Sequence, residues 1–328
     1  MTQAPLNRSV EFAAIINSFN RKSLLERALA SLTAALRKLE TGSAIVVFDA
    51  DSNDGSVEFL RNWSEANPSD NIVLIESGTS SVSFSEGVNR ACAVALEKFP
   101  DCRWLFLYET DNWLGDVDPI QDAVRLLERE SRLAAAGFTV KRHSGEFCGY
   151  GIRFPTVLSL ALGLNLSARW KLEQPNNSEW TTTDGIRWRK CDVVFTSPLL
   201  IRREAWLQTG GLDAQRFPFS ETDVDWAWRC AELDWEMGVI ASDQVVHDNL
   251  KQASAWSANR VIQFHRSRLR LLKLHRGKWV GLIKPVLFVR HCIEALLLTF
   301  RQRTDTAARA KLEKRREMLR TVWNDYSA

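Results

Sequence analysis

Two carboxylates lie one residue apart at the end of an apolar run: Glu109 and Asp111 follow Trp104–Tyr108. Two such charges repel each other unless a cation lies between or near them. Carboxylate oxygens suit Mg²⁺ or Mn²⁺, and proteins commonly hold these ions together with the oxygens of a substrate diphosphate. The pair therefore predicts a divalent metal site that also binds a phosphorylated ligand.

Three further carboxylates, Glu221, Asp223 and Asp225, lie at the start of a predicted helix that continues through Trp226–Leu233. Acidic residues in a first helical turn interact favourably with the helix dipole, so capping is the simplest interpretation. The alternative is that one of them lies beside a substrate hydroxyl and removes its proton as a general base. His247 follows a short apolar run, and it either is structural or gives a nitrogen ligand to the same cation.

The elements that must position these side chains alternate between strand and helix. Short apolar runs predict strands at Phe12–Ile16, Ala44–Phe48, Ile72–Ile75 and Trp104–Tyr108, and helical spacing predicts helices at Leu24–Leu39, Val57–Trp63 and Gly87–Phe99. This alternation predicts an α/β fold with a mainly parallel sheet and helices on both faces. Ligands of such sheets bind at the carboxyl ends of the strands, so Asn17–Arg21, Asp49–Ser56 and Glu109–Asn112 are expected at one edge.

The later part of the chain is less regular. Ala134–Val140 and Val193–Arg203 read as strands, and Glu204–Thr209 reads as a short helix that ends at Gly210. Residues 141–190 have no clean periodicity, and their fold stays open at this stage.

Charge divides the chain into two predicted domains. Residues 1–250 carry 25 Lys and Arg against 35 Asp and Glu, whereas residues 251–328 carry 18 against 5. A basic extension suits an anionic membrane surface, a pyrophosphate or a nucleic acid. The chain has no recognisable nucleic-acid-binding motif, so we expect no nucleic acid partner.

The most apolar stretch, Trp279–Phe300, is interrupted by charged residues such as Lys284, Arg290 and Glu294. It falls short of the roughly 18 consecutive apolar residues of a spanning helix, so an amphipathic helix at the membrane surface is expected, with an ordinary packed helix as the alternative. Met1–Val10 lacks the features of a signal peptide, which favours a cytoplasmic protein, peripheral on the inner face of the plasma membrane. The six cysteines are scattered, which favours reduced thiols over disulfides or structural zinc.

Taken in order, the motifs resemble glycosyltransferase family 2, whose members have the GT-A fold. Ala14–Arg21 is similar to the family's opening strand and P-T-Y-N-R turn, and Val46–Ser56 is similar to V-V-D-N-G-S-T-D-G-S. Leu105–Asp111 lies where the D-x-D motif, or N-P-D in the rhamnosyltransferase-like branch, is expected. Pro198–Arg229 resembles the family's G-G-F-D and E-D-V-D region, and Asn259–His275 resembles its R-N-R-L helix.

The resemblance implies a metal-dependent inverting hexosyltransferase that uses a UDP-, dTDP- or GDP-sugar. It implies Asp223 as catalytic base, and Asp111 and His247 as ligands of Mg²⁺ or Mn²⁺. The residues implied at the donor nucleotide are Ser18, Asn20, Asp49, Asp51, Asn89 and Glu109, and those implied at the acceptor or diphosphate are Glu221, Asp225, Arg266 and Arg268. The implied acceptor is a saccharide, carried on a lipid in bacterial surface polysaccharide synthesis.

Two alternatives remain open. Asn17 replaces the family's proline, Ala50 replaces an Asp or Asn, and Glu109 replaces an Asp, which would suit a catalytically inactive module that binds a nucleotide sugar or a membrane. The retention of the metal ligands and the base argues against it. A nucleotidyltransferase would need a glycine-rich loop after the first strand, and residues 17–22 contain no glycine.

Overall fold

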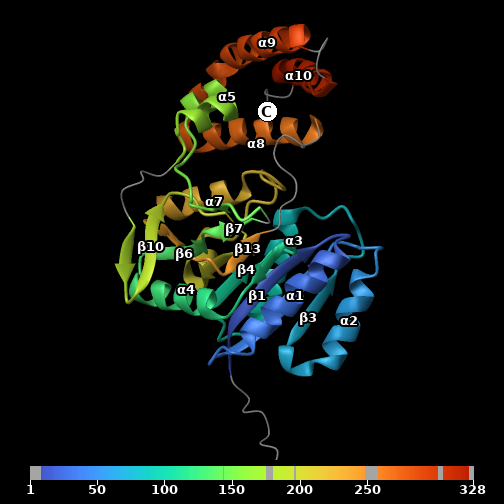
Figure 1. Ribbon diagram of the computed structural model, residues 1–328, viewed down its shortest axis with the longest axis vertical. Coiled ribbons are helices and arrows are strands. Elements are labelled where there is room, and N and C mark those ends of the chain that lie inside the picture. The colour runs from blue at the N-terminus through green and yellow to red at the C-terminus, as the bar shows by residue number, and fades with distance from the viewer. Residues whose placement is uncertain are drawn as a thin grey trace, which may run out of the picture. The chain divides into compact units, whose positions relative to one another are not determined.

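A computed structural model describes residues 9–142, 144–174, 180–195, 197–247, 258–301 and 306–324. It divides the chain into two compact units: residues 1–152 with 175–250, here the α/β unit, and residues 153–174 with 251–328, here the helical unit (Figure 1). The sequence prediction kept residues 153–174 in the first domain, and the structure assigns them to the second. The predicted boundary at residue 250 and most of Met1–Val10, the segment examined for a signal peptide, lie outside the described residues.

The α/β unit is built on a nine-stranded sheet in the order β3-β2-β1-β4-β11-β6-β12-β10-β9. Its strands are β1 Val10–Ser18, β2 Gly42–Asp49, β3 Ile72–Glu76, β4 Trp104–Leu107, β6 Leu133–Phe138, β9 Thr181–Thr183, β10 Ile186–Cys191, β11 Leu199–Arg202 and β12 Glu236–Ile240. Only β10 and β11 run against the other seven strands of this sheet. The predicted α/β class with a mainly parallel sheet is confirmed.

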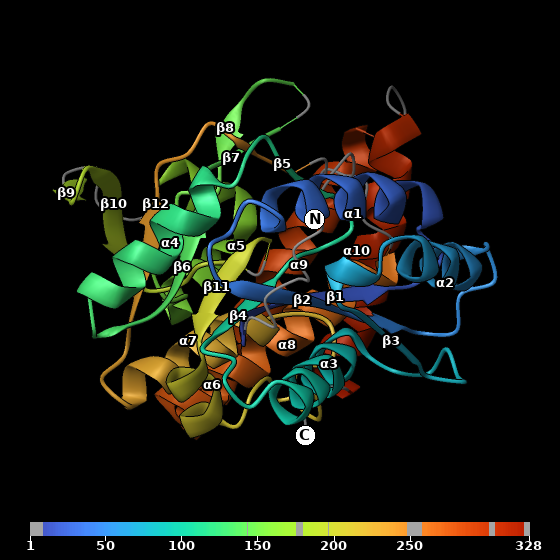
Figure 2. The ribbon, with the colours of Figure 1, turned by 90° about the horizontal axis from the view of Figure 1, so that it is seen from below.

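Helices cover both faces of this sheet, which is why its central strands are apolar on both sides (Figure 2). One face carries α1 Lys22–Leu36, α2 Ser56–Ala66 and α4 Asp118–Arg129, and the other carries α3 Phe84–Lys98, α6 Arg203–Thr209 and α7 Thr222–Glu232. The first face is held by one hydrophobic cluster, in which Leu25, Leu29 and Leu32 of α1 pack against Phe12 and Ile16 of β1. A short 3-10 turn, η1 Pro68–Asp70, precedes β3.

The register of the strands aligns their carboxyl ends. Ser18 pairs with Asp49, and Asp49 pairs with Glu76, so β1, β2 and β3 end side by side. A second sheet in the order β5-β13-β7-β8 comprises Asn112–Leu114, Val245–His247, Val140–Lys141 and Phe147–Cys148. Within it, His247 pairs directly with Asn112, which brings the end of β13 to the turn that follows β4.

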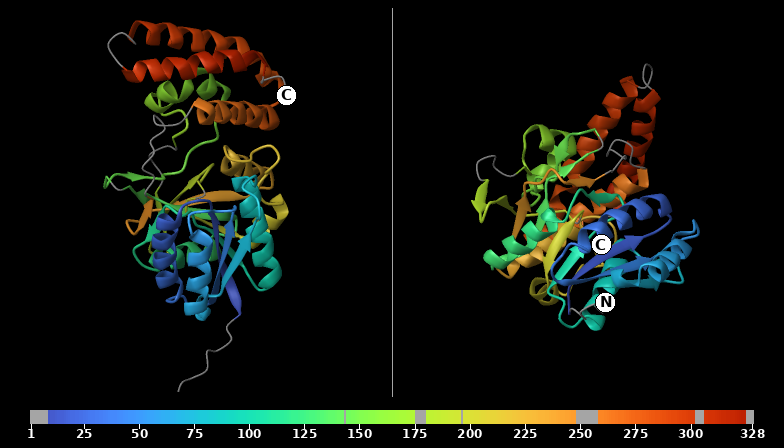
Figure 3. Two further views of the ribbon diagram at one scale, coloured as in Figure 1. Left: turned by 90° about the vertical axis from the view of Figure 1, so that its right-hand side faces the viewer. Right: turned by 60° about the horizontal axis from the view of Figure 1, so that its bottom comes forward.

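The helical unit consists of α5 Val157–Arg169, α8 Ala258–Arg276, η3 Lys278–Ile283, α9 Lys284–Arg301 and α10 Thr306–Asn324 (Figure 3). Among the helices that the structure describes, none is long and apolar enough to cross a membrane. Two strand predictions were too long: Val193–Arg203 forms a strand only at β11, and Ala134–Val140 is divided between β6 and β7. The stretch left open by the sequence contains β8, α5, β9 and most of β10.

Candidate active site at the carboxyl edge of the sheet

Asp111 and His247 meet at the carboxyl edge of the sheet. Asp111 lies in the turn between β4 and β5, and its Oδ1 lies 3.6 Å from Nδ1 of His247. The other oxygen, Oδ2, accepts a 3.4 Å contact from Nη1 of Arg21, whose side chain is half exposed. The Oδ1 atom of Asp111 is buried without a hydrogen-bond donor. A buried carboxylate oxygen without a partner is unfavourable, and a bound cation would satisfy it.

The imidazole of His247 is held in place by two polar side chains. Nδ1 lies 2.9 Å from Oδ1 of Asn112 and 3.0 Å from Oγ of Ser197, and Ser197 Oγ is also 3.1 Å from the same Asn112 oxygen. In the tautomer that donates from Nδ1 to Asn112, the lone pair of the ring is on Nε2. Metal-binding histidines are commonly oriented in this way by a hydrogen bond at the other ring nitrogen.

The side chains at this edge fit a divalent cation that is shared with a substrate. Among the described residues, no group of three or more His, Cys, Asp or Glu side chains gathers as a complete cage. Mg²⁺ and related ions are often held by one or two carboxylates and complete their shells with phosphate oxygens and water. Asp111 and His247 would hold the ion, which would then bind the diphosphate of the ligand.

The loops after β1 and β2 are bonded to each other next to this pair. The backbone N–H of Asn20 donates to Ser52 Oγ at 2.8 Å, and Asn20 Oδ1 accepts from the backbone N–H of Asn53 at 2.9 Å. Asn20 and Asp51 have left-handed backbones, with φ of 50° and 68°, a conformation that Asn and Asp tolerate better than other side chains. Both residues are exposed and help to shape the edge of the site.

Ser18 and Asp49, which pair across β1 and β2, have different surroundings. The Oγ of Ser18 is buried without a hydrogen-bond partner, so it is a group that a ligand could satisfy. Asp49 is fully buried, and its carboxylate accepts 2.7 Å and 2.8 Å bonds from the backbone N–H and Oγ of Ser52. Asp49 therefore fixes the loop that begins at Ala50. Its predicted contact with the nucleotide stays a prediction.

One carboxylate in the second loop links the first two helices. Asp54 accepts 2.8 Å from the backbone N–H of Lys22 and 2.5 Å from the hydroxyl of Ser56, the first residues of α1 and α2. Burial alone would raise the pKa of Asp54, but these hydrogen bonds lower it below its ordinary value. The ionised carboxylate thus holds both helix N-termini at the carboxyl edge.

The acidic segment before α7 is anchored to the same edge. Thr222 Oγ1 lies 2.7 Å from Ser85 Oγ, and Ser85 also donates to the carbonyl of Phe217 at 2.6 Å. Ser85 is in the first turn of α3, which follows the carboxyl end of β3. Asp223 is half-buried, whereas Glu221 is buried in a left-handed conformation with φ of 65°. Such strain in a non-glycine residue is often found at functional sites.

Three residues predicted at the ligand have partners within the fold. Asn89 binds both backbone groups of Leu212, at 2.7 Å and 2.9 Å. Asp225 is fully buried and pairs with Arg229 at 2.8 Å. Arg268 belongs to α8 of the helical unit, as does Arg266, and it pairs with Glu173 of the same unit at 2.9 Å. These bonds give each of the three side chains a role in support of the fold, and the predicted ligand contacts of Asn89, Asp225 and Arg268 stay predictions.

The structure adds residues that the sequence did not assign. Arg21 contacts Asp111, and Asn112 and Ser197 orient His247. Arg21 closes the first motif and Asn112 follows Asp111, so their positions offered a signal. Ser197 offered none, because only the folded chain brings the turn before β11 to the ring of His247. Glu109 lies half-buried in the same turn as Asp111.

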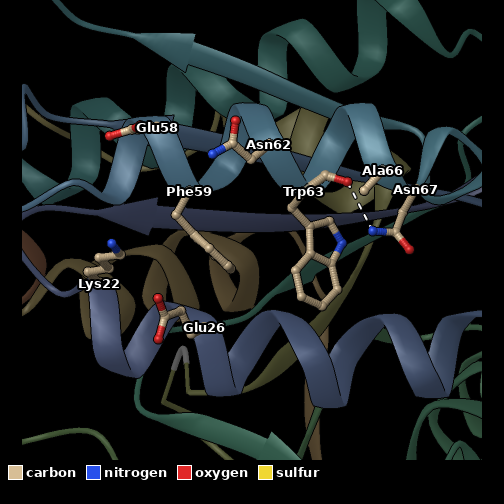
Figure 4. Close-up of a pocket in the computed structure, with 8 residues that line it drawn as sticks. All are labelled: Lys22, Glu26, Glu58, Phe59, Asn62, Trp63, Ala66 and Asn67. Carbon is tan, nitrogen blue, oxygen red and sulfur yellow. Dashed lines mark hydrogen bonds between the residues drawn. The ribbon is translucent and has the colours of Figure 1, made fainter.

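A groove with a volume of about 440 Å³ lies elsewhere, between α1 and α2 (Figure 4). Phe59 and Trp63 point from α2 toward α1, and the eight lining residues, Lys22, Glu26, Glu58, Phe59, Asn62, Trp63, Ala66 and Asn67, are different from those predicted at the site. We place the chemistry at the carboxyl edge rather than in this groove, because Asp111, His247 and the unpartnered oxygens are at that edge.

No family model matches the chain. It is 26% identical over 269 residues to the N-acetylglucosaminyl-diphospho-decaprenol L-rhamnosyltransferase of two Mycobacterium tuberculosis strains, a match that covers 78% of this chain and 82% of the relative. Its structure is similar to the mannosyltransferase PcManGT of Pyrobaculum calidifontis, solved with GDP-Man and Mn²⁺, with a TM-score of 0.54, 15% identity and coverage of 98% of this chain and 92% of that one.

The structure is also similar to that of GalNAc-T7, solved with UDP, GalNAc and Mn²⁺. The TM-score is 0.57 at 11% identity, and the match covers 81% of this chain and 48% of the other. At such low identity, the two structural likenesses bear on the fold alone. The ordered motifs, the site at the carboxyl edge of the sheet, the GT-A fold and the rhamnosyltransferase relative together indicate a glycosyltransferase that acts on a nucleotide sugar and is similar to members of family 2.

Proposed function

We propose that the protein is a metal-dependent, inverting hexosyltransferase in which Asp223 is the catalytic base. The observation that carries the proposal is the buried, unpartnered Oδ1 of Asp111 facing His247 at the carboxyl edge of the sheet. A cation there, Mg²⁺ or Mn²⁺, would neutralise the charge that develops on the departing nucleoside diphosphate. The Mn²⁺ in two solved structures of similar fold supports this choice of ion.

Other residues of the chain are proposed to transfer the proton and to bind the donor and the acceptor. Asp223 would take the proton from the acceptor hydroxyl, whose oxygen attacks the anomeric carbon as the bond from that carbon to the diphosphate oxygen breaks. Attack from the face opposite the leaving group inverts the configuration in one step, so one base suffices. Ser18, Asn20, Asp51 and Glu109 are proposed to border the donor, and Arg21 to contact its diphosphate, because it lies beside Asp111. Glu221 is proposed to help hold the acceptor.

The acceptor is proposed to be a saccharide on a lipid diphosphate, used in bacterial surface polysaccharide synthesis. The support is the similarity to the mycobacterial relative, an N-acetylglucosaminyl-diphospho-decaprenol L-rhamnosyltransferase. Such an acceptor is held in a membrane, so we propose a peripheral position on its cytoplasmic face. The donor is a UDP-, dTDP- or GDP-sugar, and the match to a rhamnosyltransferase favours testing dTDP-rhamnose first.

The test measures release of nucleoside diphosphate from these donors by the purified protein, with Mn²⁺, Mg²⁺ or a chelator, and with or without a lipid-diphosphate-linked N-acetylglucosamine. Asp111→Asn should abolish metal-stimulated turnover, and Asp223→Asn should abolish transfer while donor binding is retained. Asp184→Asn is the matched control, because Asp184 is an exposed carboxylate that pairs with Arg129 and lies in the turn between β9 and β10.

An inactive binding module predicts a different result. It would bind the nucleotide sugar with the same affinity in wild type and in Asp223→Asn, and no preparation would turn the donor over. Equal turnover in wild type and Asp223→Asn would instead remove Asp223 from the mechanism.

A further inference from the structure

The helix α9 exposes a row of large apolar side chains, whereas Arg290 and His291 point inward. The large apolar residues Val286, Val289, Ile293, Leu296, Leu297 and Phe300 are 52% to 72% exposed. They recur every three or four residues, so they form a single stripe about 21 Å long on one side of the helix. The same exposed side includes Pro285 and Cys292, and between residues 285 and 300 it carries no charged residue.

The polar residues of α9 face the interior of the helical unit. Arg290 donates at 2.5 Å and 2.9 Å to the carbonyls of Leu160 and Ala161, which lie just before the kink of α5 at Gly163. His291 is fully buried, and Glu294 pairs with Arg315 of α10 at 2.8 Å. The orientation of α9 is thus fixed by buried hydrogen bonds and ion pairs, and the apolar stripe is presented outward.

The stripe begins one turn before α9. Trp279 and Leu282 of η3 are 59% and 79% exposed, and the exposed cations Arg276 and Lys278 immediately precede Trp279. A contiguous exposed apolar patch of this kind marks a surface that contacts an apolar partner. An aromatic residue next to cations at one end of such a stripe is typical of a helix that lies in a membrane interface.

We propose that the stripe from Trp279 to Phe300, on η3 and α9, docks on the surface of an anionic lipid bilayer. The charge of the segment decides between a bilayer and a second copy of the chain. Residues 251–328 carry 18 Lys and Arg against 5 Asp and Glu, so two copies repel each other, whereas anionic headgroups attract the segment. The proposal extends the peripheral location proposed above by naming the face and its lipid, and it rests on exposed residues outside the catalytic machinery.

The exposed thiol of Cys292 gives a direct reporter of docking. An environment-sensitive fluorophore is attached to it in a Cys148→Ser background, because the other four cysteines are buried. We expect a blue shift with vesicles that contain phosphatidylglycerol, a weaker one with phosphatidylcholine alone, and a response that declines as salt increases. A blue shift that grows with protein concentration in the absence of lipid would indicate self-association and would overturn the proposal.

Co-sedimentation with the same vesicles tests the stripe itself. Ile293→Glu with Leu297→Glu should weaken binding at least tenfold, because two charges replace two apolar contacts with lipid. The matched control is Leu207→Glu with Leu233→Glu, two exposed leucines of the α/β unit at 55% and 48% exposure. Circular dichroism checks the fold of each variant.

Hydrolysis of the free donor should be unchanged in the stripe variant, so failure of docking and failure of the proposed chemistry give different results. Undiminished vesicle binding by a folded Ile293→Glu, Leu297→Glu protein would contradict the proposal.

Discussion

The helices α1 and α9 are both amphipathic, but they differ in which side is buried: α1 buries its apolar side, and α9 exposes much of its apolar side. In α1, Leu25, Leu29 and Leu32 are fully buried on the sheet, and Arg27 is exposed. In α9, His291 is fully buried, while Leu296 and Leu297 are more than half exposed. Burial of polar groups next to exposure of apolar ones is the informative departure from the usual rule. The contrast supports the proposal that one face of the helical unit docks on lipid.

The contrast also separates two kinds of polar cluster. At the strand-end site, buried atoms of Ser18 and Asp111 have no hydrogen-bond partner, as expected where a ligand completes the structure. In the helical unit, Glu294 pairs with Arg315 and Arg290 donates to two carbonyls of α5, so that cluster orients α9, although Nδ1 of the buried His265 also lacks a hydrogen-bond partner. Chemistry is therefore expected in the first unit and surface attachment in the second.

The largest effect expected is on turnover. Asp223→Asn keeps the shape of the side chain but removes its basicity, and loss of a general base lowers kcat by about 10²- to 10⁴-fold. Vesicle binding should be unchanged if the two units divide their roles as the comparison indicates. Steady-state kinetics and co-sedimentation on one preparation measure both. A loss of vesicle binding in this variant would break the comparison.

The next effect is on stability. Asp225→Ala leaves Arg229 without its buried partner, and removal of one member of such a pair lowers the free energy of unfolding by about 3 kcal/mol. Urea denaturation measures this. The control Asp122→Ala breaks the exposed pair with Arg125 on α4 and should change stability by no more than about 0.5 kcal/mol. A large loss of donor affinity in Asp225→Ala at full stability would instead show that Asp225 takes part in donor binding.

The sequence predicted those features of the site that follow from the order and direction of the strands. Apolar runs located the strands, and parallel strands end at one edge, so the clusters at Ser18, Asp49 and Asp111 were correctly expected together. The sequence could not predict which polar atoms the fold itself uses. Asn89 is 123 residues from Leu212 along the chain, and only the packing of α3 against the turn at Gly211 joins them.

The orientation of α9 was also beyond the sequence. Its apolar residues occupy more than one face, so the pattern alone leaves the buried side undetermined. The kink at Gly163 places two carbonyls within reach of Arg290, and this turns the arginine inward. Contacts between residues so far apart in the sequence leave no recognisable pattern in the local sequence. For the same reason, Ser197 was missed as a partner of His247.

A smaller effect is expected on metal affinity. Asn112→Ala removes one of the two side chains that orient His247, and loss of such a partner lowers metal affinity by about 10- to 100-fold. The concentration of Mn²⁺ that gives half-maximal turnover should therefore rise, while turnover at saturating Mn²⁺ changes less. Asn62→Ala in the groove between α1 and α2 is the control. An unchanged Mn²⁺ dependence would remove His247 from the metal site.

The smallest effect expected is a pH dependence confined to the helical unit. Burial, followed by the charges of Arg290 and other nearby cations, lowers the pKa of His265 well below its ordinary value of 6.5, and burial also lowers that of His291. Above pH 6.5 both rings are neutral whether folded or unfolded. Below pH 6.5 the unfolded chain binds protons that the folded unit excludes, so stability falls as the pH falls toward the folded pKa values.

Hydrogen exchange should show α8 and α9 opening on acidification before the central sheet strands, and His265→Phe should reduce this dependence of opening on pH. If the sheet opened first, the buried histidines would not be the acid-sensitive element, and the orientation of α9 would not depend on their neutrality.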